Sequence, residues 1–138
     1  MYYLKLSRII TLTCLFFIVL GSGLNAQCSY PIVATACVGA CGSPSEINYT
    51  VSPPCIAKWR KYCVVNESSS LCPDHNAFAI VLVDGILVTS GNITAVGSSL
   101  GFTAKCESDI KVIATTFYVG GGIVCVWLGN LNYSLREQ

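Results

Sequence analysis

Cysteine residues constrain this chain more than any other feature, because nine of them lie in only 138 residues. One of the nine, Cys14, falls inside an apolar N-terminal run and is expected to be removed with it. An even number of remaining cysteines in a small domain predicts a framework of up to four disulfides with no free thiol. Eight cysteines allow about a hundred pairings, so the connectivity stays open. The eight are Cys28, Cys37, Cys41, Cys55, Cys63, Cys72, Cys106 and Cys125.

The N-terminus is typical of a secretory signal peptide. Lys5 and Arg8 precede an uncharged apolar run at 9–20, and small residues follow that run. The run is shorter than the ~20 residues that a membrane helix needs, so we expect secretion and cleavage. Cleavage after Ala26 fits best, and cleavage after Gly23 is the alternative.

The chain that remains after residues 1–26 are removed, 27–138, has the length of a single small domain. Without Lys5 and Arg8 it holds six basic and seven acidic residues, a net charge of −1. This balance does not favour binding to nucleic acid or to an anionic membrane.

Four N-glycosylation acceptor motifs agree with an extracellular location. The composition of the mature chain predicts about one such motif by chance. We therefore expect at least two of the four to carry glycans. The acceptor residues are Asn48, Asn66, Asn92 and Asn132.

The residue pattern predicts an all-β fold, a small disulfide-rich β-sandwich. Residues 28–72 hold six cysteines and show no sustained period, so we expect loops and short strands there. Asp84-Gly85 lies between two apolar, β-branched runs and predicts a hairpin turn in which both residues have positive φ. The first of these runs is apolar at consecutive positions, so we expect cover on both of its faces. Strands are expected at 77–83, 86–90, 93–96, 100–106, 110–119 and 123–131.

The stretch 112–135 carries no charge and is long enough to cross a bilayer. Gly120 to Gly122 interrupt it, and Thr and β-branched residues dominate it. We therefore interpret it as a hairpin with a glycine turn, and expect no membrane span in the mature chain.

Motifs that suggest catalysis or metal binding are weak. Ser99 is central in a G-x-S-x-G motif, but a strand-like segment follows it and the chain is too short for the hydrolase fold. His75, the single histidine, lies upstream of it, in a turn-rich setting. Cys37 and Cys41 could open a zinc site, but disulfides are favoured in a secreted chain. We expect no enzyme activity, no cofactor and no metal.

One basic and aromatic segment stands out in a chain with only 11% charged residues. If this segment is extended, Lys58 and Arg60 lie on one face and Trp59 and Lys61 on the other. The favoured interpretation places Trp59 in the core under solvated cations. The alternative is a contact surface for an anionic or aromatic partner. That candidate surface comprises Lys58, Trp59, Arg60, Lys61 and Tyr62.

Two cysteine pairs, Cys37/Cys41 and Cys63/Cys72, are followed by the stretches 77–88, 101–109 and 120–127. Together they resemble the six-cysteine extracellular domain of nematode secreted proteins, a family without an assigned activity. The resemblance implies a bond between the family's first and third cysteines, here Cys37 and Cys63. Cys28 and Cys55 are extra, and we expect them to pair with each other. The residues after Cys106 lack the glycine and tryptophan that the family often has there.

These features predict a secreted, glycosylated module that binds an extracellular protein or glycan. A structural component of an extracellular matrix or cuticle is the alternative, and a small secreted hydrolase using Ser99 and His75 is a remote one.

Overall fold

The computed structural model describes residues 28–39, 45–53, 59–71, 75–118 and 129–138, and the predicted signal peptide lies outside these residues. The described residues form strands and no helix. No helix of the described part is long and apolar enough to cross a membrane. The strands are β1 (Ile32–Val38), β2 (Glu46–Thr50), β3 (Trp59–Ser70), β4 (His75–Val83), β5 (Ile86–Asn92), β6 (Ser99–Lys105), β7 (Asp109–Tyr118) and β8 (Asn130–Glu137).

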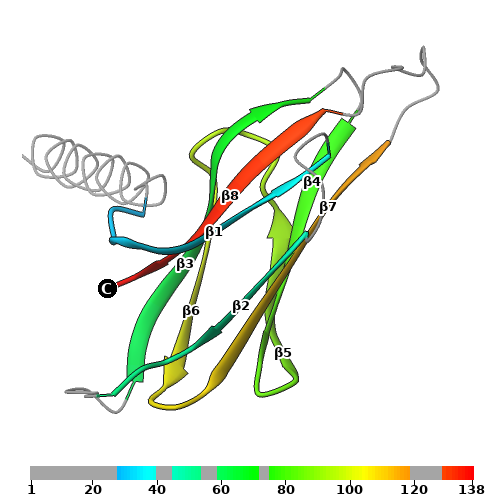
Figure 1. The fold of residues 1–138 in the computed structure, drawn as a ribbon. Helices are drawn as coiled ribbons and strands as arrows, with labels where there is room; N and C mark the ends of the chain where they lie inside the picture. Colours follow the sequence, from blue (N-terminus) through cyan, green and yellow to red (C-terminus); the bar gives the residue numbers. More distant parts are fainter. Residues whose placement is uncertain (1–27, 40–44, 54–58, 72–74, 119–128) are drawn as a thin grey trace, which may run out of the picture.

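The strands build two antiparallel four-stranded sheets that pack as a sandwich (Figure 1). The first sheet has the order β1-β8-β3-β6, and the second has the order β2-β7-β4-β5. The expected all-β sandwich is therefore confirmed.

The core lies between the sheets and combines large and small side chains. The first sheet contributes Tyr62 and Tyr133, each 1% exposed. The second sheet contributes fully buried alanines at Ala77, Ala79 and Ala114 as well as larger residues such as Val81 and Val112. A mixture of large and small side chains lets two layers interdigitate at the density of a protein interior.

The hairpin between β4 and β5 forms as expected. Asp84 has φ of 51° and Gly85 has φ of 79°, so both central residues take the left-handed conformation that this turn requires. The side chain at Asp84 also accepts a hydrogen bond of 2.9 Å from the amide of Asp109 on β7.

One strand prediction differs from the structure. Residues 93–96 are a loop and turn that carry the chain from the second sheet to the first, so the strand expected there is wrong. The glycine-turn hairpin expected from 110–119 to 123–131 falls largely on residues that the structure does not describe. The expected turn at 120–122, and most of the expected strand at 123–131, lie outside the described residues.

The cysteine-rich half contains more regular structure than its sequence suggested. β3 spans 12 residues, whereas short strands were expected there. It pairs with β8 on one side and β6 on the other, so its main-chain groups are bonded even where side chains are polar.

The second sheet buries only its inner face. Phe78, Ile80 and Leu82 alternate with the buried residues of β4 and are half-buried on the outer side. Phe117 on β7 is 41% exposed and meets Phe78 edge-to-face, with ring centroids 6.5 Å apart. The expected cover on both faces of 77–83 is therefore incomplete.

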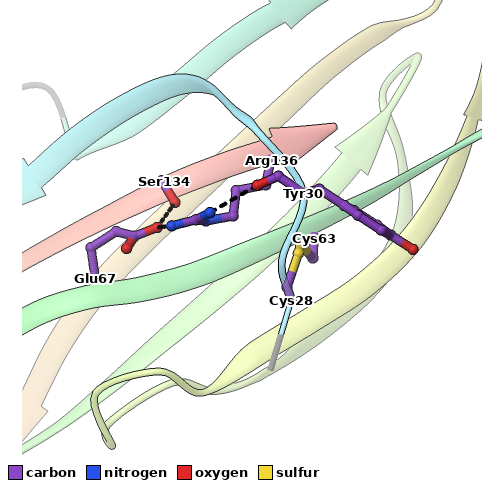
Figure 2. Close-up of a disulfide and its surroundings, with 6 residues drawn as sticks. All are labelled: Cys28, Tyr30, Cys63, Glu67, Ser134 and Arg136. Carbon is purple, nitrogen blue, oxygen red and sulfur yellow. Dashed lines mark hydrogen bonds and ion pairs between the residues drawn. A yellow bond between two sulfur atoms is a disulfide. The ribbon is translucent and has the colours of Figure 1, made fainter. Parts of the chain in front are cut away.

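One disulfide of the described residues joins Cys28 to Cys63. Both pairings expected for these cysteines, Cys28 with Cys55 and Cys37 with Cys63, are therefore wrong. The cause is long-range: β3 carries Cys63 on the outer face of the first sheet, where the segment before β1 crosses it (Figure 2). Cys106 is also disulfide-bonded.

Candidate functional site

The basic and aromatic segment forms the start of β3, and its side chains alternate between the two faces of the first sheet. Trp59 is 51% exposed, and Lys61 is also exposed on that outer face. Tyr62 points inward and is 1% exposed. The alternation is as expected, but the favoured interpretation of Trp59 as a core residue is wrong, because Tyr62 fills the core instead. Lys58 lies outside the described residues.

The neighbouring strand β6 adds a second cation beside the tryptophan. Lys105 is the register partner of Trp59, and Thr103 is the partner of Lys61. The Nζ atom of Lys105 lies 4.8 Å from the centroid of the Trp59 ring, within cation–π range. We call Trp59, Lys61, Thr103 and Lys105 the basic strip. Sequence reasoning missed Thr103 and Lys105, because only the pairing of β3 with β6 brings them there.

A pocket of about 590 Å³ continues the basic strip along β3 and β6. Gly101 leaves space in its floor, since a Cβ built there would meet nothing closer than the Tyr62 carbonyl oxygen at 4.0 Å. Hydroxyl groups and aromatic rings share the walls. The pocket is lined by Cys28, Ser29, Tyr30, Lys61, Tyr62, Cys63, Ser99, Gly101, Phe102 and Thr103.

One wall of the pocket is the segment 28–30, which we call the N-terminal strap. The bond from Cys28 to Cys63 anchors it to β3 (Figure 2). A second anchor is Arg136 on β8, whose Nη1 donates a hydrogen bond of 2.8 Å to the carbonyl oxygen of Tyr30. The strap is therefore fastened to both central strands of the first sheet, which preorganises the pocket wall.

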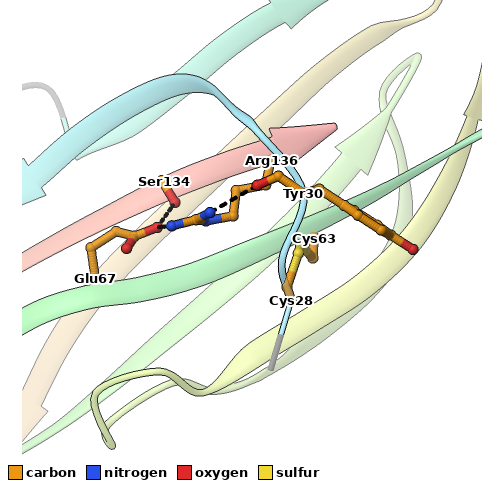
Figure 3. A network of polar contacts seen from close by, with 6 residues as sticks. All are labelled: Cys28, Tyr30, Cys63, Glu67, Ser134 and Arg136. Atoms are coloured by element: carbon orange, nitrogen blue, oxygen red, sulfur yellow. Dashed lines mark hydrogen bonds and ion pairs between the residues drawn. A yellow bond between two sulfur atoms is a disulfide. The ribbon is translucent and has the colours of Figure 1, made fainter. Parts of the chain in front are cut away.

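Arg136 is itself held by a carboxylate (Figure 3). Glu67 lies at a bulge of β3, where the register with β8 shifts, and its Oε1 accepts a hydrogen bond of 2.7 Å from Arg136 Nε. The hydroxyl of the buried Ser134 donates to the same oxygen. Partial burial alone would raise the pKa of Glu67. The hydrogen bonds from Ser134 and Arg136 and the guanidinium charge outweigh it and hold that pKa below its ordinary value.

A second charged cluster lies on the inner side of the sheet. Arg60 pairs with Glu137 of β8, and the Tyr49 hydroxyl donates a hydrogen bond of 2.7 Å to the same carboxylate. Partial burial, followed by this hydrogen bond, raises the pKa of Tyr49 to about 12. The bond to Glu137 raises the pKa of Arg60. Arg60 is thus held in an ion pair within the fold and does not extend the basic strip.

Ion pairing leaves the two lysines of the basic strip uncompensated. Glu67 and Glu137 each pair with an arginine, and within the described ranges neither Lys61 nor Lys105 forms an ion pair. An exposed indole beside two such cations suits a ligand with negative charge and a flat apolar surface.

The four acceptor asparagines differ in exposure. Asn48, Asn92 and Asn132 are exposed, whereas Asn66 is fully buried. The Asn66 Nδ2 atom donates to the carbonyl oxygens of Ile93 and Thr94, at 2.7 and 3.2 Å. The loop that joins the two sheets is fastened to β3 in this way.

The residues that suggested hydrolysis lie in different sheets. Ser99 begins β6 in the first sheet and lines the pocket, whereas His75 begins β4 in the second. A strand follows Ser99, not the helix that the hydrolase motif needs. No group of three or more His, Cys, Asp or Glu residues suited to a metal ion occurs in the described part of the chain. Cys41, the partner in the zinc alternative, lies outside it.

Comparison with protein-family models, with curated proteins and with solved structures finds no match to this chain.

Proposed function

We propose that this chain is a secreted, glycosylated, disulfide-stabilised domain that binds an extracellular protein or glycan, and that the basic strip is its contact surface. The observation that carries the proposal is the exposed indole of Trp59 beside two lysines without ion pairs in the described chain. Tryptophan is among the residues that most often dominate the binding energy of an interface.

The construction of the surface supports a binding role. The strip and the pocket stand on two paired strands, and the disulfide to Cys63 fastens the strap over them. The backbone of paired strands loses little further freedom when a ligand binds, so less of the interaction energy is spent on ordering it. The uncommitted lysines would also raise the association rate with an anionic partner.

The same features give little support to catalysis. Ser99 is the one pocket residue that suggested a nucleophile. His75, the histidine considered as its catalytic partner, begins a strand of the opposite sheet. A Ser99→Ala variant tests the hydrolase alternative, because it would abolish any hydrolytic activity that depends on this residue.

The resemblance to the nematode six-cysteine domain remains part of the proposal. It would imply an extracellular location and no particular activity. The bond from Cys28 to Cys63 departs from the first-to-third pairing that the resemblance implies. Peptide mapping of all the disulfides of the secreted protein would test the resemblance directly.

The binding role is tested with the secreted protein on a panel of immobilised extracellular proteins and glycans. The test variant is the triple change Trp59→Ala, Lys61→Ser and Lys105→Ser. The control is Lys111→Ser, which removes an exposed cation from β7 in the second sheet. We expect the wild type and the control to bind at least one ligand that the triple variant does not bind.

Two results would overturn the proposal. Binding that survives in the triple variant would place the contact surface elsewhere. A protein that leaves the producing tissue only after disulfide reduction, and binds nothing on the panel, would instead be a structural matrix component.

A further inference from the structure

We infer that the ligand of the basic strip is a linear polysaccharide that carries sulfate or carboxylate groups. This inference rests on the proposed function and names the chemical class of its ligand. It follows from the spacing of the cations, from the polar character of the pocket, and from the small apolar area of the surface.

The two lysines form a diagonal pair. Lys105 is opposite Trp59, and Lys61 is two residues further along β3 on the same face. Diagonal neighbours on adjacent antiparallel strands lie about 7–8 Å apart. Two cations on neighbouring strands match a ligand with repeated negative groups better than a single small anion, which one lysine would satisfy.

The binding surface is elongated. Trp59 and Lys61 follow one another on the outer face of β3, about 7 Å apart at about 3.3 Å per residue. Cys63, the next residue on that face, is buried and bonded to Cys28 of the strap. The pocket beneath the strap continues from Lys61 toward Ser99. A linear chain could lie on the strip and extend into the pocket, whereas a compact ligand would use only one of the two.

The walls suit sugar rings. Ser29, Tyr30, Ser99 and Thr103 contribute hydroxyl groups, each of which both donates and accepts hydrogen bonds, as sugar hydroxyls do. The exposed indole of Trp59 offers a flat apolar surface with a polar edge, against which the C–H face of a sugar ring can pack.

An acidic protein fits this surface less well. A stable protein interface buries about 800 Å² on each partner around an apolar centre from which charged residues are depleted. Trp59 is the one exposed large apolar side chain of the basic strip. Other exposed apolar residues of the described chain lie apart from it, on or near β1, β5 and β7.

The test measures the affinity of the mature wild-type protein for four probes in solution. Heparin carries sulfates and carboxylates, and hyaluronan carries carboxylates alone. Poly-glutamate is an acidic peptide, and dextran is an uncharged polysaccharide. We expect binding to heparin or hyaluronan that weakens as salt rises, because exposed charges are screened. Binding to poly-glutamate should be weaker and binding to dextran absent.

Variants separate local recognition from net charge. Lys61→Ser with Lys105→Ser should weaken polysaccharide binding about tenfold or more, whereas Lys111→Ser should leave it within about twofold. Trp59→Ala should also weaken binding but leave its salt dependence unchanged, since it removes packing surface and no charge. Circular dichroism of each variant verifies the fold.

The inference is overturned if poly-glutamate binds as tightly as the polysaccharides, which would indicate an acidic protein partner. It is also overturned if Lys111→Ser weakens binding as much as the double change, or if none of the charged probes binds. In the last case the proposed function is judged separately by the panel of extracellular ligands. Loss of another ligand in the triple variant would preserve the binding role and reject only the polysaccharide.

Discussion

The side-chain amide of Asn66 donates a hydrogen bond of 2.7 Å to the main-chain carbonyl oxygen of Ile93, and both residues are fully buried. Asn66 belongs to β3 in the first sheet, whereas Ile93 begins the loop that leaves β5 of the second sheet. The main chain of Asn66 reinforces this contact, because its carbonyl oxygen accepts from Gly97 and its amide donates to Ser98. The crossing between the sheets is thus fastened to β3 through Asn66.

We predict that Asn66→Ala lowers the free energy of unfolding by about 2–4 kcal/mol. The change leaves the carbonyl oxygens of Ile93 and Thr94 without their side-chain donor, and an unsatisfied buried polar group costs about 1–3 kcal/mol. Urea unfolding of protein without glycans measures the effect. Asn132→Ala, at an exposed asparagine, is the control and should stay within about 0.5 kcal/mol of wild type. Equal losses in the two variants would contradict this account.

The same geometry predicts that Asn66 carries no glycan in the folded, secreted protein. An N-linked sugar on its Nδ2 atom would have to occupy space that is filled by the loop at 93–94. Ser68→Ala removes the acceptor motif and should leave the mass of the secreted protein unchanged apart from the substitution. Asn48→Gln, at an exposed acceptor, is the comparison and should remove one glycan if that site is used. A glycopeptide containing Asn66 in correctly folded protein would refute the prediction.

Trp59 and Tyr62 should respond in opposite ways to truncation. Tyr62 stacks on Phe102, with centroids 5.5 Å apart, and is buried, so Tyr62→Ala should destabilise by about 3–5 kcal/mol through cavity formation. Trp59 is half exposed, so Trp59→Ala should change stability by no more than about 0.5 kcal/mol. Melting temperatures measured by circular dichroism compare the two variants. A similar fall in both would restore Trp59 to a structural role.

Acid should weaken the network that holds the N-terminal strap. The pKa of Glu67 is lower in the folded protein than the ~4.3 of an unfolded chain. Its carboxylate therefore contributes stability that is fully present above about pH 4.3 and is lost as pH falls through the lower folded pKa.

We expect Glu67→Gln to be less stable than wild type at pH 7 and to lose less stability between about pH 5 and 3. Urea unfolding across this pH range measures both effects. Glu107→Gln, at an exposed glutamate in the turn after β6, is the matched control and should retain the wild-type slope. A parallel acid dependence in wild type and Glu67→Gln would show that Glu67 contributes nothing to it.

The accuracy of the sequence predictions depends on how local each feature is. The turn at Asp84-Gly85 was correct because the conformation of two residues decides it. β8 was not predicted beyond residue 131, although its alternation was readable: Leu131, Tyr133 and Leu135 are buried between polar neighbours. The polar residues of that segment lower its overall hydrophobicity, and the expected strand ended at 131 for that reason. The prediction of a strand at 93–96 was wrong for the opposite reason. The apolar residues there belong to a loop that is hydrogen-bonded to Asn66.

Only part of the candidate site could be predicted from the sequence. Period-two alternation placed Trp59 and Lys61 on one face, but it left open which face pointed to the core. Which face points to the core depends on the side chains of the neighbouring strands and of the opposite sheet. Lys105 and Thr103 could not be assigned to the site before the register of β3 and β6 was known. The buried state of Asn66 was equally invisible, since an acceptor motif is defined by three residues and burial by distant ones.

The sequence by itself determined the all-β class, the hairpin turn at Asp84-Gly85 and the alternation along the start of β3. These features follow from backbone conformations and side-chain periods within a few residues. Only the tertiary structure decided that Cys28 bonds to Cys63, that Tyr62 and not Trp59 fills the core, and that Lys105 lies over the indole. Each of these depends on the register and packing of strands far apart in the chain. One strand's sequence specifies two faces, and its neighbours decide which of them is buried.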